Sequence, residues 1–297
     1  MKNLKNPSQW KGVWTALITP FQNDKNLDEV SFKSLIEKQI SEGITGLVIA
    51  GSTGEGSLLD DQQYELVLKK ALEYANGRIP IVAGLGIGGT RESLKRGKIA
   101  KSAGVTGLLA SPPAYIKTPA RGLVEHFLEI AKIELPLCLY DVPGRSAQVL
   151  PDEVIDTLLA SKDPAAQFIC ALKDASGKTE RLIGKSLWKE KLALLSGDDE
   201  SFVQFVKNGG HGIISVATHF ALKDFTAVLK NPVEASPRFE KILPFIGGLY
   251  WESNPIPTKS LCKKLGWIAG DNFQAPLVPM KAALLEKLNG LYRESFS

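Results

Sequence analysis

Eight short apolar runs rich in β-branched residues recur along the chain, each followed by a longer amphipathic segment. This alternation is typical of parallel strands that are buried on both faces and joined by helices. Eight strand–helix units predict a closed (β/α)8 TIM barrel, with an open, doubly wound α/β sheet as the alternative. The runs are residues 13–18, 46–50, 79–84, 107–111, 136–141, 167–173, 192–197 and 212–216.

The chain continues well beyond the eighth run. It has 297 residues, and those after 216 have helical patterning, which favours the barrel over the open sheet. We expect a barrel over residues 1–224 and a C-terminal helical extension over residues 225–297. Thr118-Pro119 and Leu150-Pro151 resemble helix starts with proline in the first turn.

Composition excludes several classes of function. The 36 basic and 32 acidic residues are scattered, and the net charge of +4 implies neither a nucleic acid nor a membrane surface as partner. No apolar stretch has the length of a membrane span or a signal-peptide core, so we expect a cytoplasmic protein. Cys138, Cys170 and Cys262 have no close pairing and no histidine at ligand spacing, which argues against disulfides or a metal site.

The sequence GLGIGG at 84–89 matches a dinucleotide-binding pattern after a predicted strand. Such a fold also requires an acidic residue about 20 positions later, at the end of the next strand. This chain has Leu109, Ala110 and Ser111 there. The glycines therefore indicate a tight turn between strand and helix.

Glycines and hydroxyl residues follow the second predicted strand in the sequence GSTGEGS, residues 51–57. Active sites of (β/α)8 barrels are built from the loops after the strands. Ser52 and Thr53 offer hydroxyls beside free N–H groups, a combination that can hold a carboxylate. The same sequence also fits an ordinary cap of the helix that begins near Asp60.

Two further clusters follow later strands. Tyr140 and Arg145 lie in LYDVPGR after the fifth run, and Lys173 ends the sixth. A tyrosine can pass a proton, and an arginine can bind a carboxylate through two parallel hydrogen bonds. The alternative is a buried anchoring tyrosine, a surface arginine and a solvated lysine at a strand end. The predicted barrel places all three clusters at one mouth, which favours a shared site.

A lysine in such a mouth has a specific chemistry. Loss of hydration in an apolar rim favours a neutral amine, which is a nucleophile. The amine of Lys173 can attack a keto group to form a Schiff base, whose enamine can add to an aldehyde. Tyr140 would carry protons, and the Ser52–Thr53 loop would hold the carboxylate of a 2-oxo acid. This chemistry requires no cofactor, and we expect none.

Six motifs, in this order, resemble those of the dihydrodipicolinate synthase family: GSTGE, YDVPGR, ALKDASG, LLSGDD, GGHGIISV and NPIP. The opening TALITPF agrees, so the resemblance covers almost the whole chain. It implies a lyase that condenses pyruvate with L-aspartate 4-semialdehyde through a lysine Schiff base. The product would be 4-hydroxy-tetrahydrodipicolinate, on the route to diaminopimelate and lysine.

The resemblance also implies a site of eight residues. Arg145 would bind the carboxylate of the semialdehyde, and a neighbouring subunit would supply Tyr115 from the loop at 111–119, which implies a homodimer or homotetramer. The catalytic residues would be Lys173, Tyr140, Ser52 and Tyr115, and the substrate-binding residues would be Thr53, Arg145, Gly197 and Ile214.

Other functions remain open at this stage. N-acetylneuraminate lyases and 2-keto-3-deoxy sugar acid aldolases share the lysine and the tyrosine, and GSTGE also occurs in the lyases. Arg145 favours the synthase, because the lyases resemble an alanine-leucine pattern at that turn. A barrel that binds an oxo acid without catalysis is a third hypothesis, against which the lysine argues.

Two positions depart from the family pattern. Ser52 stands where threonine is usual in the synthases, and it keeps the hydroxyl that the proton relay needs. Asp141 replaces an asparagine after the tyrosine, and the sequence assigns it no role.

A regulatory site found in some synthases is also altered. These synthases are inhibited by lysine, which binds at the dimer interface. Of the side chains that form this site in them, only the glutamate, Glu92, is present here. The effector's carboxylate has lost its partners, so we predict insensitivity to lysine. The corresponding residues are Asp61, Tyr64, Gly88, Glu92 and Ala114.

Overall fold

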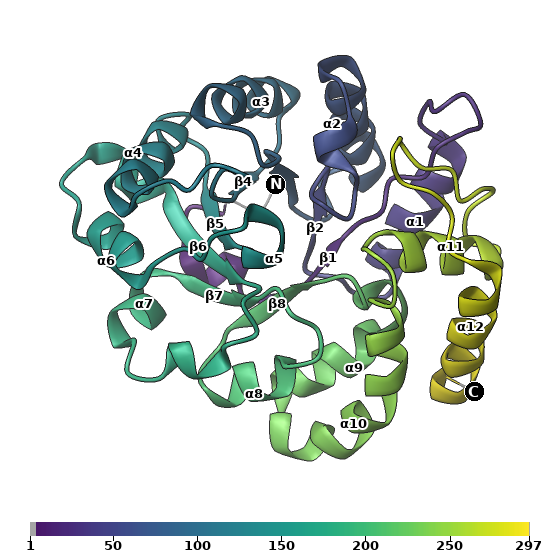
Figure 1. Ribbon diagram of the computed structural model, residues 1–297. Helices are drawn as coiled ribbons and strands as arrows, with labels where there is room; N and C mark the ends of the chain where they lie inside the picture. Colours follow the sequence, from purple (N-terminus) through teal and green to yellow (C-terminus); the bar gives the residue numbers. More distant parts are fainter. Residues whose placement is uncertain (1–3, 297) are drawn as a thin grey trace.

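Eight parallel strands close into a barrel in the order β1 to β8, and β8 pairs with β1 (Figure 1). The computed structural model describes residues 4–296. The predicted barrel is confirmed. The last residue of each predicted run lies within two positions of the last residue of the corresponding strand. The strands are β1 (Gly12–Ala16), β2 (Gly46–Ile49), β3 (Ile81–Gly84), β4 (Gly107–Ala110), β5 (Leu137–Asp141), β6 (Ile169–Asp174), β7 (Ala193–Ser196) and β8 (Gly212–Ser215).

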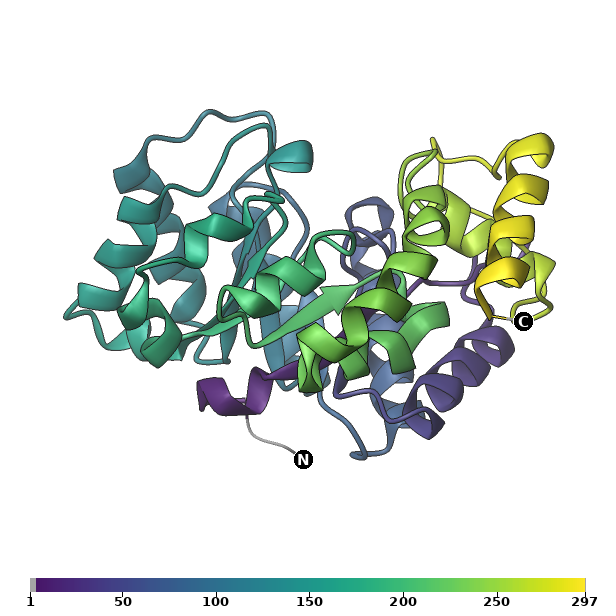
Figure 2. The ribbon, with the colours of Figure 1, turned by 90° about the horizontal axis from the view of Figure 1, so that it is seen from below.

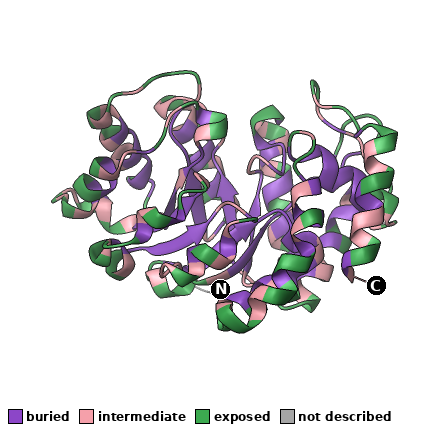
Figure 3. Ribbon diagram, turned by 60° about the horizontal axis from the view of Figure 1, so that its bottom comes forward, coloured by how far each residue is buried: buried purple, intermediate pink, exposed green. Residues whose placement is uncertain are grey.

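The strands are largely apolar, as expected of strands whose two faces are both covered. Figure 3 shows them buried almost throughout, between the barrel interior and the surrounding helices. The surrounding helices are α1 (Glu29–Ser41), α2 (Asp61–Ala75), α3 (Thr90–Ala103), α4 (Ala120–Ala131), α6 (Asp152–Ala160), α7 (Ser186–Lys191), α8 (Phe202–Lys207) and α9 (Thr218–Lys230). A short further helix, α5 (Pro143–Ser146), lies in the loop between β5 and α6.

Two prolines directly precede helices instead of lying, as predicted, in their first turn. Pro119 and Pro151 are the N-caps of α4 and α6, outside the first turn. Both have φ near −65° and an extended ψ, a conformation that suits an N-cap as well as it suits proline.

Tryptophans close the N-terminal end of the barrel. Trp10, in the short helix η1 (Pro7–Trp10), stacks on Trp14 of β1 with ring centroids 5.4 Å apart. The indole of Trp14 donates a hydrogen bond to the carbonyl of Trp10 over 2.7 Å, and both side chains are fully buried. Access to the interior is therefore from the opposite end, where the strands finish.

Three helices form the C-terminal part: α10 (Pro232–Gly248), α11 (Ile256–Lys264) and α12 (Ala282–Phe296). They lie at one side of the barrel, where α10 packs on α9 and α12 (Figure 2). The predicted boundary at residue 224 lies inside α9, and dividing the chain there remains a prediction. Among residues 4–296, no helix combines the length and apolarity needed to cross a membrane.

Candidate active site

A cavity of about 360 Å³ opens at the C-terminal ends of the strands. It brings together seven of the eight predicted site residues: Ser52, Thr53, Tyr140, Arg145, Lys173, Gly197 and Ile214. They come from the loops or ends of five different strands, so the barrel alone gathers residues that lie far apart in the sequence.

Lys173 lies near the end of β6 and is only 6% exposed. It pairs in register with Tyr140 of β5, and its Nζ lies 4.3 Å from the centroid of the Tyr140 ring. A Cβ at Gly197 would lie 2.7 Å from Cε of Lys173. Glycine at 197 therefore leaves the space that the lysine side chain occupies, besides the substrate-binding role that the family resemblance implies.

The loop after β2 is a compact turn structure. Ala50 and Glu55 have left-handed φ values of 52° and 57°, and the N–H of Glu55 donates to the carbonyl of Ser52 over 3.2 Å. The helix-cap alternative for this loop is wrong, because Asp60 itself caps α2 by accepting from the N–H of Gln63. The loop is thus free to present Ser52 and Thr53 to the cavity.

A fully buried ion pair connects the loop after β2 to the C-terminal part of the chain. Glu55 pairs with Lys259 of α11, and both side chains are 0% exposed. The Nζ of Lys259 also donates to the carbonyl of Asn272 over 3.0 Å and lies 4.4 Å from the centroid of the Phe21 ring. Burial lowers the pKa of Lys259 to about 8 and raises that of Glu55, while the attraction between the two opposes both shifts.

Tyr115 lies outside this cavity. Its side chain is 98% exposed and its backbone is left-handed, with φ of 68°. A bulky residue in that conformation on an open surface is uncommon. Within one chain, Tyr115 does not join the other seven residues, and its role in the site remains a prediction.

A model of the Dihydrodipicolinate synthetase family matches residues 9–294. The chain belongs to this family. The 4-hydroxy-tetrahydrodipicolinate synthase of Shigella dysenteriae serotype 1 is 35% identical over 276 residues, which cover 91% of this chain and 93% of that protein. The predicted family is confirmed, and the relative's name agrees with the synthase hypothesis rather than the lyase alternative.

Solved structures of the family have the same fold. Dihydrodipicolinate synthase of Acinetobacter baumannii, chloride-inhibited and complexed with pyruvate, is 34% identical with a TM-score of 0.88, covering 96% of this chain and 98% of that chain. The enzyme of Cyanidioschyzon merolae with lysine bound is 29% identical with a TM-score of 0.89, covering 99% of each chain.

One residue of the family's NPIP motif links both predicted carboxylate-binding groups. The side-chain amide of Asn254 donates to Oγ1 of Thr53 over 2.9 Å. The backbone carbonyl of Asn254 accepts from Nη2 of Arg145 over 2.8 Å. In the sequence, NPIP marks only the family resemblance, and no local signal there reveals this bridge.

Tyr250 lines the cavity and is held by a buried aspartate, a contact that the sequence did not reveal. Tyr250 follows α10, and its hydroxyl donates to Oδ2 of Asp199 over 2.9 Å. Asp199 also accepts from the N–H of Ala217 over 2.9 Å, and its burial raises the pKa of its carboxyl group. Residues after 249 therefore complete a site whose other walls come from the barrel.

Proposed function

We propose that the protein is a 4-hydroxy-tetrahydrodipicolinate synthase that condenses pyruvate with L-aspartate 4-semialdehyde. The observation that carries the proposal is the buried Lys173, which lines the cavity with its Nζ against the Tyr140 ring. A coupled assay tests it by offering pyruvate with the semialdehyde and, separately, pyruvate with N-acetylmannosamine. Turnover only with the second pair would contradict it. A role in the biosynthesis of diaminopimelate and lysine agrees with the cytoplasmic location predicted from the sequence.

The proposed reaction uses the site in sequence. The amine of Lys173 attacks C2 of pyruvate, and loss of water leaves an imine. Removal of a C3 proton gives the enamine, which forms a carbon–carbon bond with the aldehyde. Tyr140 supplies the proton that the new alkoxide takes up. The acceptor's own amine then displaces Lys173 as the ring closes, which releases the enzyme.

Replacing Arg145 by alanine is expected to impair only the second half-reaction. Its guanidinium lines the cavity, and loss of a charge-assisted contact with the acceptor's carboxylate costs about 1.5–3 kcal/mol, or about 10- to 150-fold in kcat/KM. Steady-state kinetics with varied semialdehyde measures the loss, and borohydride trapping of pyruvate measures the first half-reaction. Equal loss in both would mean that Arg145 mainly supports the loop through Asn254.

The active unit is expected to be at least a dimer. Tyr115 is almost fully exposed and lies outside its own chain's cavity, as the family resemblance requires of a residue that serves a neighbouring subunit. Sedimentation under assay conditions should therefore show a dimer or larger, and Tyr115→Phe should lower kcat without dissociating it. A fully active monomer would remove this role from Tyr115.

Lysine at millimolar concentration is expected to leave activity unchanged, since a site with few contacts provides only about 4 kcal/mol. Two of the altered residues are already engaged: Asp61 pairs with Lys95, and the hydroxyl of Tyr64 donates to the carbonyl of Gly84 over 3.0 Å. The coupled assay with added lysine measures the effect. Half-maximal inhibition well below that concentration would contradict the prediction.

A further inference from the structure

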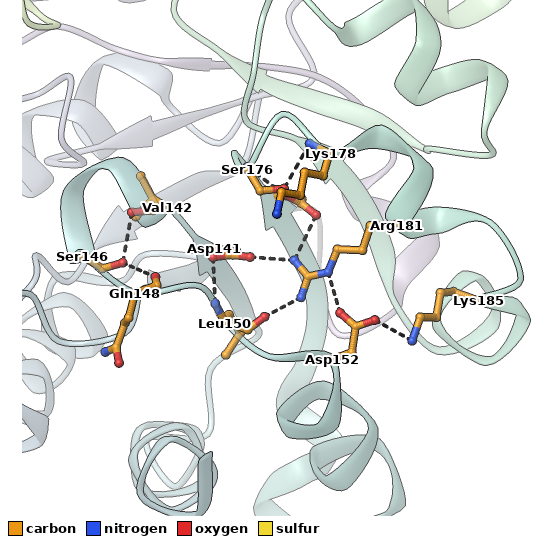
Figure 4. A network of polar contacts seen from close by, with 11 residues as sticks. Asp141, Val142, Ser146, Gln148, Leu150, Asp152, Ser176, Lys178, Arg181 and Lys185 are labelled. Atoms are coloured by element: carbon orange, nitrogen blue, oxygen red, sulfur yellow. Dashed lines mark hydrogen bonds and ion pairs between the residues drawn. The ribbon is translucent and has the colours of Figure 1, made fainter. Parts of the chain in front are cut away.

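Arg181, in the short helix η4 (Thr179–Leu182), joins a network of polar contacts with several aspartates (Figure 4). Its Nη1 is 2.6 Å from Oδ2 of Asp141 and 3.1 Å from Oδ2 of Asp174. These two aspartates are opposite each other in the pairing of β5 with β6. The pair directly before them in the same register is Tyr140 and Lys173. One guanidinium thus joins the two strands next to the residues of the proposed reaction.

The alternation of side chains along a strand sets the direction of each residue. Tyr140 and Lys173 line the cavity, so Asp141 and Asp174, one position later, are on the opposite face of the sheet. Both are buried, with 0% and 5% of their surface exposed. Burial raises the pKa of Asp141, and the guanidinium of Arg181 opposes this shift. Without that cation, two buried carboxylates would repel each other across the strand pair.

The remaining donors of Arg181 hold it in place. Its Nε lies 2.6 Å from Oδ1 of Asp152, at the start of α6, and its Nη2 donates to the carbonyl of Leu150. Oδ1 of Asp141 in turn accepts from the N–H of Leu150 over 2.9 Å. The Arg181 side chain is only 11% exposed, whereas that of Asp152 is 40% exposed and also pairs with Lys185. The network therefore has a buried end at the strands and an exposed end at α6.

We propose that Arg181 is a positioning residue for the Schiff-base step, holding Asp141 and Asp174 together so that Tyr140 and Lys173 keep their relative placement. A displacement of about 1 Å between reacting groups can lower a rate about 100-fold. The proposal gives Asp141 a role that the sequence did not reveal. It rests on the proposed function of Lys173.

The test measures imine formation with pyruvate as the rate of borohydride trapping at Lys173, as a function of pyruvate concentration. Arg181→Met removes the cation and is expected to lower the maximal rate of trapping about 100-fold. Arg181→Lys keeps a donor for both carboxylates, so its maximal rate should be about tenfold higher than that of Arg181→Met. The half-saturating pyruvate concentration should change less than about threefold, because the cavity groups that bind it remain. Asp152→Asn, which affects the exposed end of the network, is the matched control and should stay within about twofold of the parent rate.

Each outcome is decisive. A maximal rate for folded Arg181→Met within about twofold of the parent, or an equal loss in Asp152→Asn, would overturn the proposal. A loss expressed mainly in the half-saturating concentration would also overturn it, because that would indicate damage to pyruvate binding. If Arg181→Met does not fold, Arg181→Lys and Asp152→Asn decide the question by the same comparison. Absence of trapping at Lys173 in the unaltered protein would instead contradict the proposed function.

Discussion

Lys173→Ala is expected to abolish the covalent capture of pyruvate. Borohydride reduces an imine to a stable amine, so the unaltered protein should gain one pyruvate-derived mass on Lys173 and on no other residue. The alanine variant has no amine at the end of β6, and among residues 4–296 no other lysine lines the cavity. Intact-protein and peptide mass spectrometry measure both results, and turnover with the semialdehyde should be lost in parallel.

A nearby lysine provides the control for this prediction. Lys178 lies five residues later, on the exposed surface of the following loop. Lys178→Ala should be labelled as fully as the unaltered protein. Equal labelling of Lys173→Ala, or no labelling of the unaltered protein, would show that the proposed chemistry is wrong.

Of the substitutions considered, Lys259→Met is expected to lower the free energy of unfolding the most. Methionine fills much of the space between Phe21 and Phe273, but it leaves Glu55 buried without its cation. Removing one partner of a buried ion pair costs about 3–5 kcal/mol of the free energy of unfolding. Burial already places the folded-state pKa of Glu55 above its unfolded value, so protonation favours the folded state. The loss should therefore be smaller at pH 5 than at pH 8.

The same helix offers a matched control. Lys264 of α11 pairs with Glu286 over 2.7 Å, with both side chains well exposed. Lys264→Met should cost about 0–1 kcal/mol. Chemical denaturation of both variants measures the two free energies. Similar small losses in the two would mean that the Glu55–Lys259 pair contributes little.

The strands could be predicted because each is a short run of mostly apolar residues, the pattern of a strand that is buried on both faces. The sixth run, for example, was expected at 167–173 and forms β6 as Ile169–Asp174. A strand covered on both faces must be continuously apolar, and that pattern depends only on neighbouring residues. The position of Lys173 at the mouth of the barrel could be predicted by the same reasoning, because it is the first charged residue at the end of such a run.

The partners of the site residues could not be predicted in this way. Asn254 binds Thr53 across 201 positions of sequence, and Lys259 binds Glu55 across 204. Helix α11 contains three lysines, and nothing in its sequence distinguishes the buried Lys259 from the exposed Lys263 and Lys264. Only closure of the barrel and docking of the C-terminal helices determine which of them loses its water.

The bridge through Asn254 has a consequence for how this enzyme family can diversify. The barrel carries Lys173, the proposed nucleophile, whereas the segment that follows α10 lines the cavity and contacts Thr53 and Arg145 through Asn254. The two groups proposed to bind the substrate carboxylates are thus coupled through one residue outside the barrel. A changed codon at position 254 would disturb Thr53 and Arg145 together, so the proposed subsites for pyruvate and for its acceptor would have to diverge in concert.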